Sequence, residues 1–185
     1  LPALLKMLAE NHHETPFEKS SLHFLLTTDI SAHIHVLKHR IGVSVNGESA
    51  RYKELKEDKY YIPDDWVGIA QSQHKGKFAE SYHKWSDVLK NYTKAGNELY
   101  HQCLKDLEPI LGRKRAKESA RYFKTYNSQI QSDVMFNMRS FANFQKLRNS
   151  DAAQLEIREI AVKMLQLVKK IDSNPFRYTL ESWGY

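Results

Sequence analysis

The sequence predicts a mainly helical α+β domain with a small antiparallel sheet, and three observations support this prediction. Apolar residues recur at three- and four-residue steps along most of the chain, which is the spacing of amphipathic helices. Short apolar segments suited to strands occur at residues 21–27 and 128–137. The 185 residues contain no internal repeat, low-complexity tract or linker, so we expect one domain spanning residues 1–185.

The first third of the chain combines helix and strand patterns. A helix is expected over residues 3–10, followed by the strand at 21–27. Asp29 or Ser31 is expected to cap a helix that ends near residue 38. The predicted apolar face of that helix consists of Ile30, Ile34, Leu37 and Ile41. Residues 42–64 are polar and contain glycine, so we expect them to be irregular.

Helices dominate the rest of the chain. The longest is expected over residues 79–107, with an apolar stripe formed by Phe78, Tyr82, Trp85, Leu89, Tyr92, Leu99, Cys103 and Leu107. A shorter helix is expected around residues 115–125, and two more at 140–147 and 151–171. Asp151 and Gln154 form a capping-box pattern at the start of the last one. Its predicted apolar face consists of Leu155, Ile160, Met164, Leu167 and Ile171.

Composition excludes several classes of protein. The single cysteine rules out an internal disulfide framework and a Cys-based zinc finger. No apolar run approaches the roughly 20 residues that cross a bilayer, so we expect a cytoplasmic protein without membrane association. The net charge of +6 comes from 28 Lys and Arg against 22 Asp and Glu. Alone, this surplus is compatible with nucleic acid, an anionic membrane surface or a small anionic ligand.

The residues present do not favour nucleophilic or metal chemistry. Cys103 lies in the apolar stripe of the longest helix, where we expect a buried, inert thiol. His35 and His39 have the four-residue spacing of paired metal ligands, but no HExxH pattern accompanies them, and we predict no metal site. The basic run at residues 113–117 resembles a nucleic-acid patch. Such runs are more often solvated helix faces, so nucleic acid is not the favoured ligand.

Residues 38–52 form the first cluster that is typical of ligand binding. Lys38, His39 and Arg40 stand at the end of a predicted helix and precede a Gly-containing turn, Ser49 and Arg51. Backbone amides, a hydroxyl and an arginine fork suit a phosphate monoester or pyrophosphate. An ordinary basic surface loop is the alternative interpretation.

The second cluster mixes amide and guanidinium groups with phenylalanines. It contains Asn137, Arg139 and Asn143, with Arg121 and Arg148 further along the chain on either side. Planar hydrogen-bond donors in an apolar setting suit a heteroaromatic ring with carbonyl edges, such as a flavin or a pyrimidine. Structural ion pairs are the competing explanation.

Three stretches of the chain resemble the flavin-dependent thymidylate synthase family. Residues 13–18, His-Glu-Thr-Pro-Phe-Glu, resemble a His-Glu-Thr-Pro-Phe-Glu motif of the family. Residues 38–52 are similar to its Arg-His-Arg, seven residues, Ser signature and the Arg-Tyr after it. The third stretch is Asn-Met-Arg-Ser at 137–140, with Asn143-Phe144, Leu147-Arg148 and residues 153–158. A Tyr-Ile-Pro element at 61–63 and Ala120-Arg121 add smaller matches in the same order.

The resemblance implies an enzyme that makes dTMP from dUMP, with methylenetetrahydrofolate as carbon donor, NADPH as reductant and FAD as mediating cofactor. It also implies an α+β homotetramer whose active sites are built from several subunits. The residues implied at the flavin are Thr15, Lys38, His39, Arg40, Asn137, Arg139 and Asn143. Those implied at dUMP are His35, Ser49, Arg51, Arg121 and Arg148, with Ser49 and Arg148 in catalytic roles. His13 and Tyr52 are implied on the folate and nicotinamide side.

The chain also departs from the family pattern. Eight residues separate Arg40 from Ser49 where the family has seven, and Lys38 replaces an arginine. His35 and Ala152 stand where a glutamine and a flavin-contacting histidine are usual, and the family's N-terminal strand has no counterpart before Leu1. These departures indicate a divergent member, for which a phage or viral source is one interpretation. They leave two alternatives: a flavin enzyme that modifies another pyrimidine nucleotide, for example by hydroxymethylation, and a non-catalytic basic helical protein that binds nucleic acid.

Overall fold

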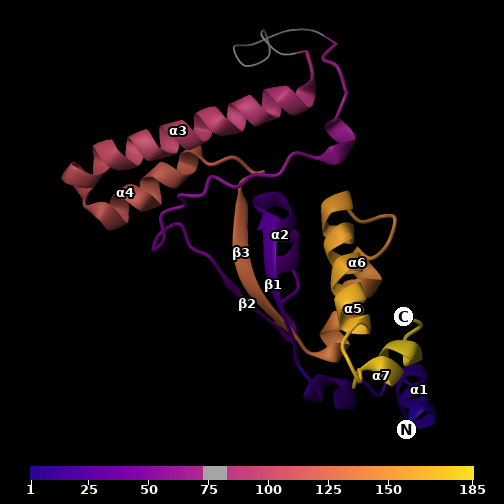
Figure 1. Ribbon diagram of the computed structural model, residues 1–185. Coiled ribbons are helices and arrows are strands. Elements are labelled where there is room, and N and C mark those ends of the chain that lie inside the picture. Colours follow the sequence, from indigo (N-terminus) through magenta and orange to yellow (C-terminus); the bar gives the residue numbers. More distant parts are fainter. Residues whose placement is uncertain (73–82) are drawn as a thin grey trace. The chain divides into compact units, whose positions relative to one another are not determined.

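The computed structural model describes residues 1–72 and 83–185, and it confirms the predicted mainly helical class with a small sheet (Figure 1). The chain divides into two compact units. Unit 1 comprises Leu1–Leu26, Ala32–Asn46 and Ser132–Tyr185, and unit 2 comprises Thr27–Ser31 and Gly47–Gln131. Each unit is described by itself below.

The secondary structure follows the predicted order with one added strand and one added helix. The α-helices are α1 (Pro2–Glu10), α2 (Ile30–Leu37), α3 (Trp85–Leu111), α4 (Arg113–Ala120), α5 (Met138–Arg148), α6 (Leu155–Lys169) and α7 (Arg177–Ser182). The strands are β1 (Leu22–Asp29), β2 (Val43–Gly47) and β3 (Gln129–Phe136). Three short 3-10 helices are η1 (Thr15–Lys19), η2 (Asp64–Trp66) and η3 (Arg121–Phe123). None of the helices in the described part of the chain is long and apolar enough to cross a membrane.

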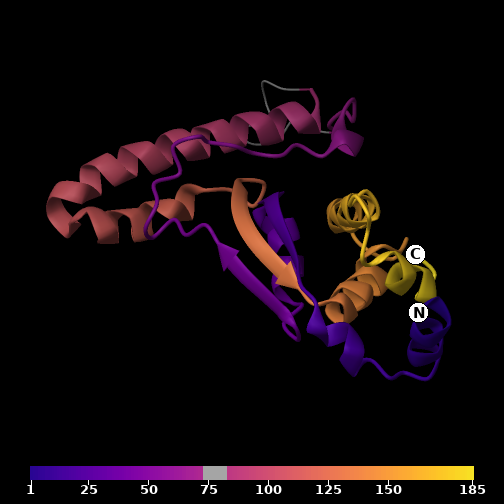
Figure 2. The ribbon, with the colours of Figure 1, turned by 60° about the horizontal axis from the view of Figure 1, so that its bottom comes forward.

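The three strands form one sheet in the order β1-β3-β2 (Figure 2). The Asn137 amide donates to the Gly42 carbonyl, and the Glu48 amide donates to the Gln131 carbonyl. Residue numbers in these pairs rise along β2 as they fall along β3, so the two strands are antiparallel. Along β1, buried and exposed side chains alternate, as expected for a strand with one face against a core.

The core of unit 1 is aromatic and lies between the sheet and two helices. Phe24 of β1 stacks on Phe141 of α5 with ring centroids 5.8 Å apart. Phe136 of β3 packs against Phe144 of α5 at 5.2 Å. From α6, residues such as Ile157 complete the cluster. Helix α5 therefore packs one face against the sheet. Arg139, Asn143 and Lys146 lie outside this buried face and are exposed.

Unit 2 is built on the α3–α4 hairpin, in which the two helices pack side by side (Figure 2). Tyr100 and Leu104 of α3 bury against Ala116 and Ala120 of α4. The alanines allow a close approach of the two helices because they carry no side chain beyond Cβ. Gly112 adopts a φ of 76° in the turn between the helices, a conformation that glycine adopts without steric cost.

The predicted buried faces of three helices were wrong. In α2, Ala32, His33 and Val36 are buried, whereas Ile34 and Leu37 are exposed, and Ile41 is 88% exposed. In α6 the buried residues are Ile157, Ala161, Met164, Leu165 and Val168, so only Met164 of the predicted face is fully buried. In α3, Trp85, Tyr92 and Leu99 are exposed while Thr93, Gly96 and Asn97 are buried. In α3, Gly96 lies inside because the Phe123 carbonyl oxygen would be only 2.6 Å from a Cβ at this position.

Several predicted boundaries also needed correction. Residues 42–64 contain the strand β2, which was expected to be irregular. Asp29 ends β1 and directly precedes Ile30, the first residue of α2, whereas Ser31 lies inside the helix. Asp151 pairs with Arg158 at 2.7 Å instead of capping, and α6 begins at Leu155. Helix α3 runs four residues beyond its predicted end, and its predicted first residues, with Phe78 and Tyr82, lie outside the described residues.

Candidate functional site

The first and third matching stretches meet at Arg139 in unit 1. Pro16 stands in the first turn of η1, where its fixed φ suits a helix start. This turn buries Phe17, and its acidic neighbours reach α5: Arg139 Nε lies 2.6 Å from Glu14 Oε2, and Nη1 lies 2.5 Å from Glu18 Oε1. The hydrogen bond to Glu18 and the charge of Glu14 raise the pKa of the exposed Arg139. Two segments more than a hundred residues apart in sequence are thus joined by one guanidinium.

The second and third stretches meet at His39. This histidine is buried and packs edge-on against Phe144, with ring centroids 4.9 Å apart. Its Nε2 accepts a hydrogen bond of 2.9 Å from Nε of Arg148. Burial and then the charge of Arg148 lower the pKa of His39. The ring is therefore neutral, with the proton on Nδ1, because the Nε2 that accepts from arginine cannot carry one.

Gly42 brings the end of the second stretch against the start of α5. Its φ is 64°, and a Cβ there would overlap Ser140 Oγ and Asn137 Nδ2. Ser140 Oγ donates to the Ile41 carbonyl at 2.6 Å, and the Asn137 amide donates to the Gly42 carbonyl at 3.1 Å. The sequence predicts a Gly-containing turn here. The structure instead shows a tightly packed backbone crossing.

Asn137 has a structural task in addition to its implied flavin contact. Its Oδ1 accepts a hydrogen bond of 2.8 Å from the Ser140 amide and so caps α5. The amide Nδ2 packs against Gly42. The cap fixes the direction in which α5 presents Arg139 and Asn143.

A pocket of about 540 Å³ in unit 1 lies beside these residues. Arg139, Asn143 and Lys146 of α5 line it together with the rings of Trp183 and Tyr185. Trp183 is held by Phe17 at a centroid distance of 4.5 Å, and the Tyr185 hydroxyl donates to the Ala142 carbonyl at 3.4 Å. The Asn143 amide and the Lys146 ammonium beside these aromatic rings fit a dinucleotide with phosphates and planar rings, so FAD is compatible with this pocket. Glu14 also lines the pocket and already pairs with Arg139.

The other residues implied at the flavin do not line this pocket. Thr15 begins η1, while Lys38 and Arg40 are exposed on either side of the buried His39. Sequence reasoning missed Trp183 and Tyr185, because nothing in the predicted elements brings the last residues of the chain to α5. The only available signal was their aromatic character at the end of an otherwise polar segment.

In unit 2, Arg51 is held by a residue that sequence reasoning missed. Its Nε donates to Oε1 of Glu118 in α4 at 2.8 Å, and its own amide donates to Ser49 Oγ at 3.3 Å. The hydrogen bond with Arg51 lowers the pKa of Glu118. Lys117 Nζ also donates to the Tyr52 carbonyl at 2.7 Å. The turn at residues 49–52 is thus fastened to α4, with the two terminal nitrogens of Arg51 left for an anion.

The remaining site residues divide between the units. Arg121 begins η3 in unit 2 and is exposed, like Arg51. His35, His39 and Arg148 belong to unit 1. His13 and Tyr52, implied on the folate and nicotinamide side, are exposed in units 1 and 2, respectively. The structure therefore brings together Ser49, Arg51 and Tyr52 in one turn, and His39 with Arg148 in one contact.

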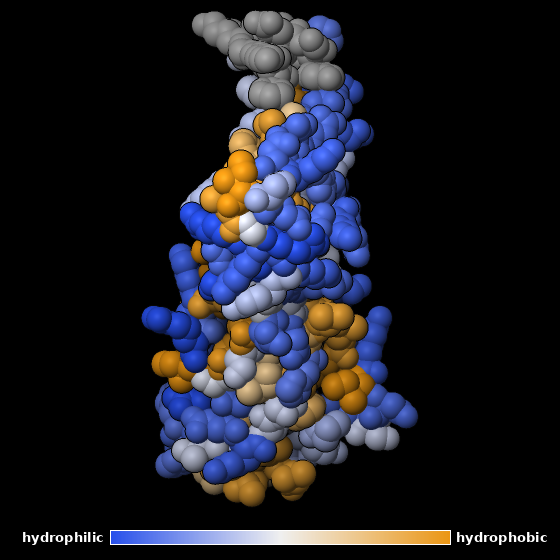
Figure 3. All heavy atoms as spheres, turned by 90° about the vertical axis from the view of Figure 1, so that its left-hand side faces the viewer, coloured by the Kyte–Doolittle hydropathy of each residue, from blue (hydrophilic) through white to orange (hydrophobic). Residues whose placement is uncertain are grey.

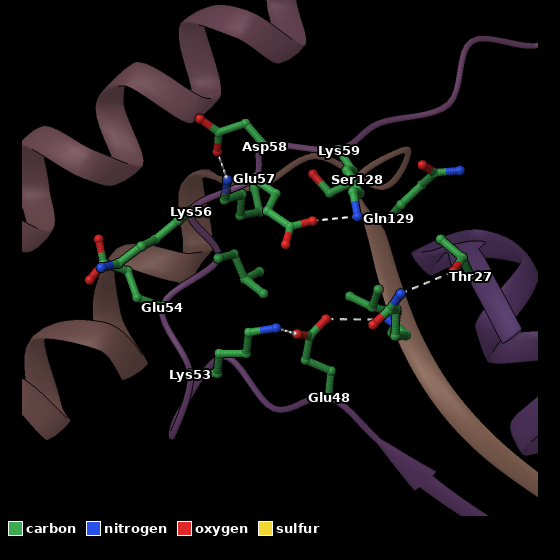
Figure 4. Close-up of a pocket in the computed structure, with 14 residues that line it drawn as sticks. Thr27, Glu48, Lys53, Glu54, Lys56, Glu57, Asp58, Lys59, Ser128 and Gln129 are labelled. Carbon is green, nitrogen blue, oxygen red and sulfur yellow. Dashed lines mark hydrogen bonds and ion pairs between the residues drawn. The ribbon is translucent and has the colours of Figure 1, made fainter. Parts of the chain in front are cut away.

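A second, smaller pocket of about 170 Å³ lies in unit 2 (Figure 4). Three pairs of its charged side chains contact each other: Lys53 with Glu48, Lys59 with Glu57, and Lys124 with Asp58. Since these charges already have protein partners, this pocket offers a ligand few free groups. At this pocket the ion pair between Lys124 and Asp58 joins the segment after η3 to the 49–58 loop.

Metal ligands and a nucleophile are not assembled by the described residues. Ranges 1–72 and 83–185 contain no group of three or more His, Cys, Asp or Glu side chains arranged to hold a metal ion. Cys103 is half-buried beside the α3–α4 core, not fully buried as predicted. It packs beside the buried cluster that Tyr100 and Leu104 of α3 form with Ala116 and Ala120 of α4.

Comparison with known proteins fits this geometry. The family described as thymidylate synthase complementing protein (Thy1) matches residues 2–172. The chain is 34% identical over 168 residues to the flavin-dependent thymidylate synthase of Thermosipho melanesiensis, which covers 90% of this chain and 71% of that protein. The chain belongs to this family. It is similar to the flavin-dependent thymidylate synthase of Thermosipho africanus (33% identity, 90% of this chain, 71% of that protein).

The flavin-dependent thymidylate synthase of Gluconobacter oxydans is 30% identical over 175 residues, and the match covers 90% of this chain. The chain spans 55% of the length of that protein. The residues that match the family, 2–172, include the stretches around His39, Arg139 and Arg148.

Proposed function

We propose that this chain catalyses the reductive methylation of dUMP to dTMP, with methylenetetrahydrofolate as carbon donor and NADPH as reductant. FAD, when bound, supplies the hydride and one-carbon transfer chemistry, so the protein needs no nucleophilic cysteine. The observation that carries the proposal is the Arg148–His39 contact, in which two separate matching stretches meet at 2.9 Å.

Arg148 is proposed to stabilise charge on the pyrimidine. Its Nε is held by the neutral His39, so the terminal nitrogens of the guanidinium remain for a ligand. Among the described residues, no ion pair with a carboxylate neutralises Arg148. A fixed cation of this kind favours the electron density that develops on a pyrimidine carbonyl when C5 acts as a nucleophile. His39 orients the cation without adding a second charge.

The phosphate of dUMP is proposed to bind in unit 2. Arg51 presents its terminal nitrogens from a turn that Ser49 and Glu118 fix. Arg121 adds a second exposed guanidinium, and Ser49 adds a hydroxyl. Bidentate arginine contacts suit a phosphate monoester. His35 is the further residue proposed at dUMP, and its buried Nδ1 has no hydrogen-bond partner among the residues that the structure describes.

The flavin is proposed to use the pocket lined by Arg139 and Asn143, together with Thr15, Lys38, His39, Arg40 and Asn137. His13 and Tyr52 are proposed on the folate and nicotinamide side. These are the chain's own groups for binding and orientation, and the guanidinium of Arg139 stays compensated by Glu14 and Glu18.

A homotetramer is proposed as the active assembly. Large apolar side chains are strongly exposed in both units, among them Leu25, Ile41, Ile110 and Tyr122. The face in Figure 3 shows apolar patches among hydrophilic side chains. Exposed apolar surface of this kind is typical of sites that contact other proteins. Light scattering coupled to gel filtration measures the assembly, and a stable monomer in the presence of FAD contradicts it.

The test of function uses the purified chain with FAD, dUMP, methylenetetrahydrofolate and NADPH under reducing conditions. Mass spectrometry of the nucleotide is expected to show a product heavier than dUMP by one methyl group in place of hydrogen. A hydroxymethylated product would instead assign a related reaction. A folded, FAD-binding protein that forms neither product contradicts the proposal.

A further inference from the structure

Unit 2 contains a buried cation that the proposed function does not use. The side chain of Lys124, which directly follows η3, is only 5% exposed. A buried ammonium is costly unless it is paired and hydrogen-bonded. Its Nζ lies 2.5 Å from Asp58 Oδ1, 2.9 Å from Asn97 Oδ1 and 4.4 Å from the centre of the Tyr100 ring. The cation is thus fully provided with partners.

Asp58 extends this cluster to the same face of α3. Its second oxygen, Oδ2, lies 2.9 Å from Nε2 of His101, and its backbone adopts a left-handed φ of 47°. The Tyr100 hydroxyl accepts a hydrogen bond of 3.2 Å from the Leu55 amide. Asn97, Tyr100 and His101 are three and four residues apart and therefore share one side of the helix. Figure 4 shows Asp58 and its ion pair at the edge of the smaller pocket.

The cluster anchors two segments that carry proposed substrate-binding arginines. Asp58 ends the loop that begins with Ser49 and Arg51, and Lys124 follows Arg121 by three residues. We propose that Lys124 is a positioning residue, whose ion pair with Asp58 holds segments 49–58 and 121–124 on one face of α3 so that Arg51 and Arg121 are presented to a nucleotide phosphate. This inference rests on the proposed function.

The other contacts of the 49–58 loop are weaker anchors. Arg51–Glu118 and Arg113–Glu54 both place the arginine at the surface, with 44% and 56% of its side chain exposed. Exposed ion pairs contribute little because water and salt screen them. The Lys124–Asp58 pair is less exposed and has additional hydrogen bonds, so its loss is expected to loosen the loop even where the surface pairs remain.

The test compares Lys124→Met, Lys124→Arg and the double variant Lys124→Met with Asp58→Met. The control is Lys105→Met, which removes an exposed lysine from α3. Calorimetry measures the Kd for dUMP, steady-state assays measure kcat and KM, and flavin fluorescence measures the Kd for FAD. We expect Lys124→Met to weaken dUMP binding at least tenfold with the FAD Kd within twofold of the original. Lys124→Arg is expected to recover most of the loss.

The double variant keeps the inference testable if Lys124→Met alone fails to fold. It leaves no unpaired buried charge, so it is expected to fold while still binding dUMP weakly. A double variant that binds dUMP as tightly as the original chain overturns the inference. Hydrogen exchange provides a readout that does not depend on dUMP: amides in 49–58 are expected to exchange faster in both methionine variants. Unchanged exchange there also overturns it, whereas absence of dTMP synthesis by the original chain contradicts only the proposed function.

Discussion

Arg148 donates a hydrogen bond from Nε to Nε2 of His39 across 2.9 Å, and this contact joins the last residue of α5 to the segment that follows α2. A cation beside a buried imidazole is tolerated because the imidazole stays neutral. The pair therefore couples the protonation of His39 to the placement of Arg148.

Stability is expected to fall as the pH drops below about 6.5, the ordinary pKa of histidine. Burial lowers the pKa of His33, and burial together with the Arg148 charge lowers the pKa of His39. A lowered folded pKa gives stability that is present above the unfolded pKa and is lost as the pH falls through the folded one. Melting temperatures between pH 8 and pH 5 measure this. His39→Gln is expected to make the melting temperature depend less on pH. His12→Asn, at an exposed position, is expected to leave that dependence unchanged. The same pH dependence in the original chain and both variants contradicts this explanation.

Arg148→Met is expected to reduce kcat by roughly 10²–10³-fold, the usual cost of removing one group that stabilises developing charge. Arg148→Lys keeps the charge and loses the planar fork, so an intermediate loss is expected. Single-turnover rates of dTMP formation measure the chemical step. Arg158→Met, which removes the partner of Asp151 in the same unit, is the matched control. A similar loss in both methionine variants would point to general destabilisation.

Gly42→Ala is expected to destabilise the chain more than Gly68→Ala. Both glycines have positive φ, so each substitution pays about 1–2 kcal/mol for the left-handed conformation. Only at Gly42 does the new Cβ overlap Ser140 and Asn137, since nothing lies within 4 Å at Gly68. Thermal unfolding followed by circular dichroism compares the two, and equal melting temperatures would show that the crossing at Gly42 can relax.

Glu118→Gln is expected to raise KM for dUMP about 5–10-fold with little change in melting temperature. The exposed ion pair contributes little to stability. Losing a charge-assisted hydrogen bond that aims Arg51 at the phosphate costs roughly 1 kcal/mol of binding. Glu108→Gln, which removes a comparable partner from Arg113, is the control. If both variants raise KM equally, the effect is one of overall charge.

Asn143→Ala is expected to raise the Kd for FAD about tenfold, the effect of losing one well-formed hydrogen bond of about 1.4 kcal/mol. Quenching of flavin fluorescence on titration measures the affinity. Asn91→Ala, at an exposed position of α3 in unit 2, controls for the loss of an amide. Unchanged FAD affinity in Asn143→Ala would move the flavin away from the pocket beside α5.

Sequence periodicity predicted where the helices lie better than which side of each is buried. The strands at 22–29 and 129–136 and the helices α1, α5 and α6 follow their predicted positions, because local patterning determines them. The buried face of α2 consists of Ala32, His33 and Val36, so the larger apolar side chains of the helix did not predict it. Strand β2 was missed because its five residues alternate polar and apolar too briefly and end in glycine.

The candidate site shows the same division. The matching stretches include Arg139, His39 and Arg148. The structure pairs Arg139 with Glu14, and His39 with Arg148. Glu118, Lys124 and Trp183 were not predicted, since their roles come from contacts across 60 or more residues of sequence, as in the pairing of Lys124 with Asp58. No local pattern encodes such partners.

Most basic side chains of the run at 113–117 pair with other groups of the same chain. Arg113 pairs with Glu54 and Glu108, Arg115 with Glu118, and Lys117 with the Tyr52 carbonyl. Because of these contacts, the basic run fastens the 49–58 loop and has fewer free cations for a polyanion. The chain should therefore elute from heparin at modest ionic strength, because a diffuse surplus of charge is screened within about 8–10 Å in ordinary buffers. The phosphate contact proposed for Arg51 would act at shorter range than this screening length.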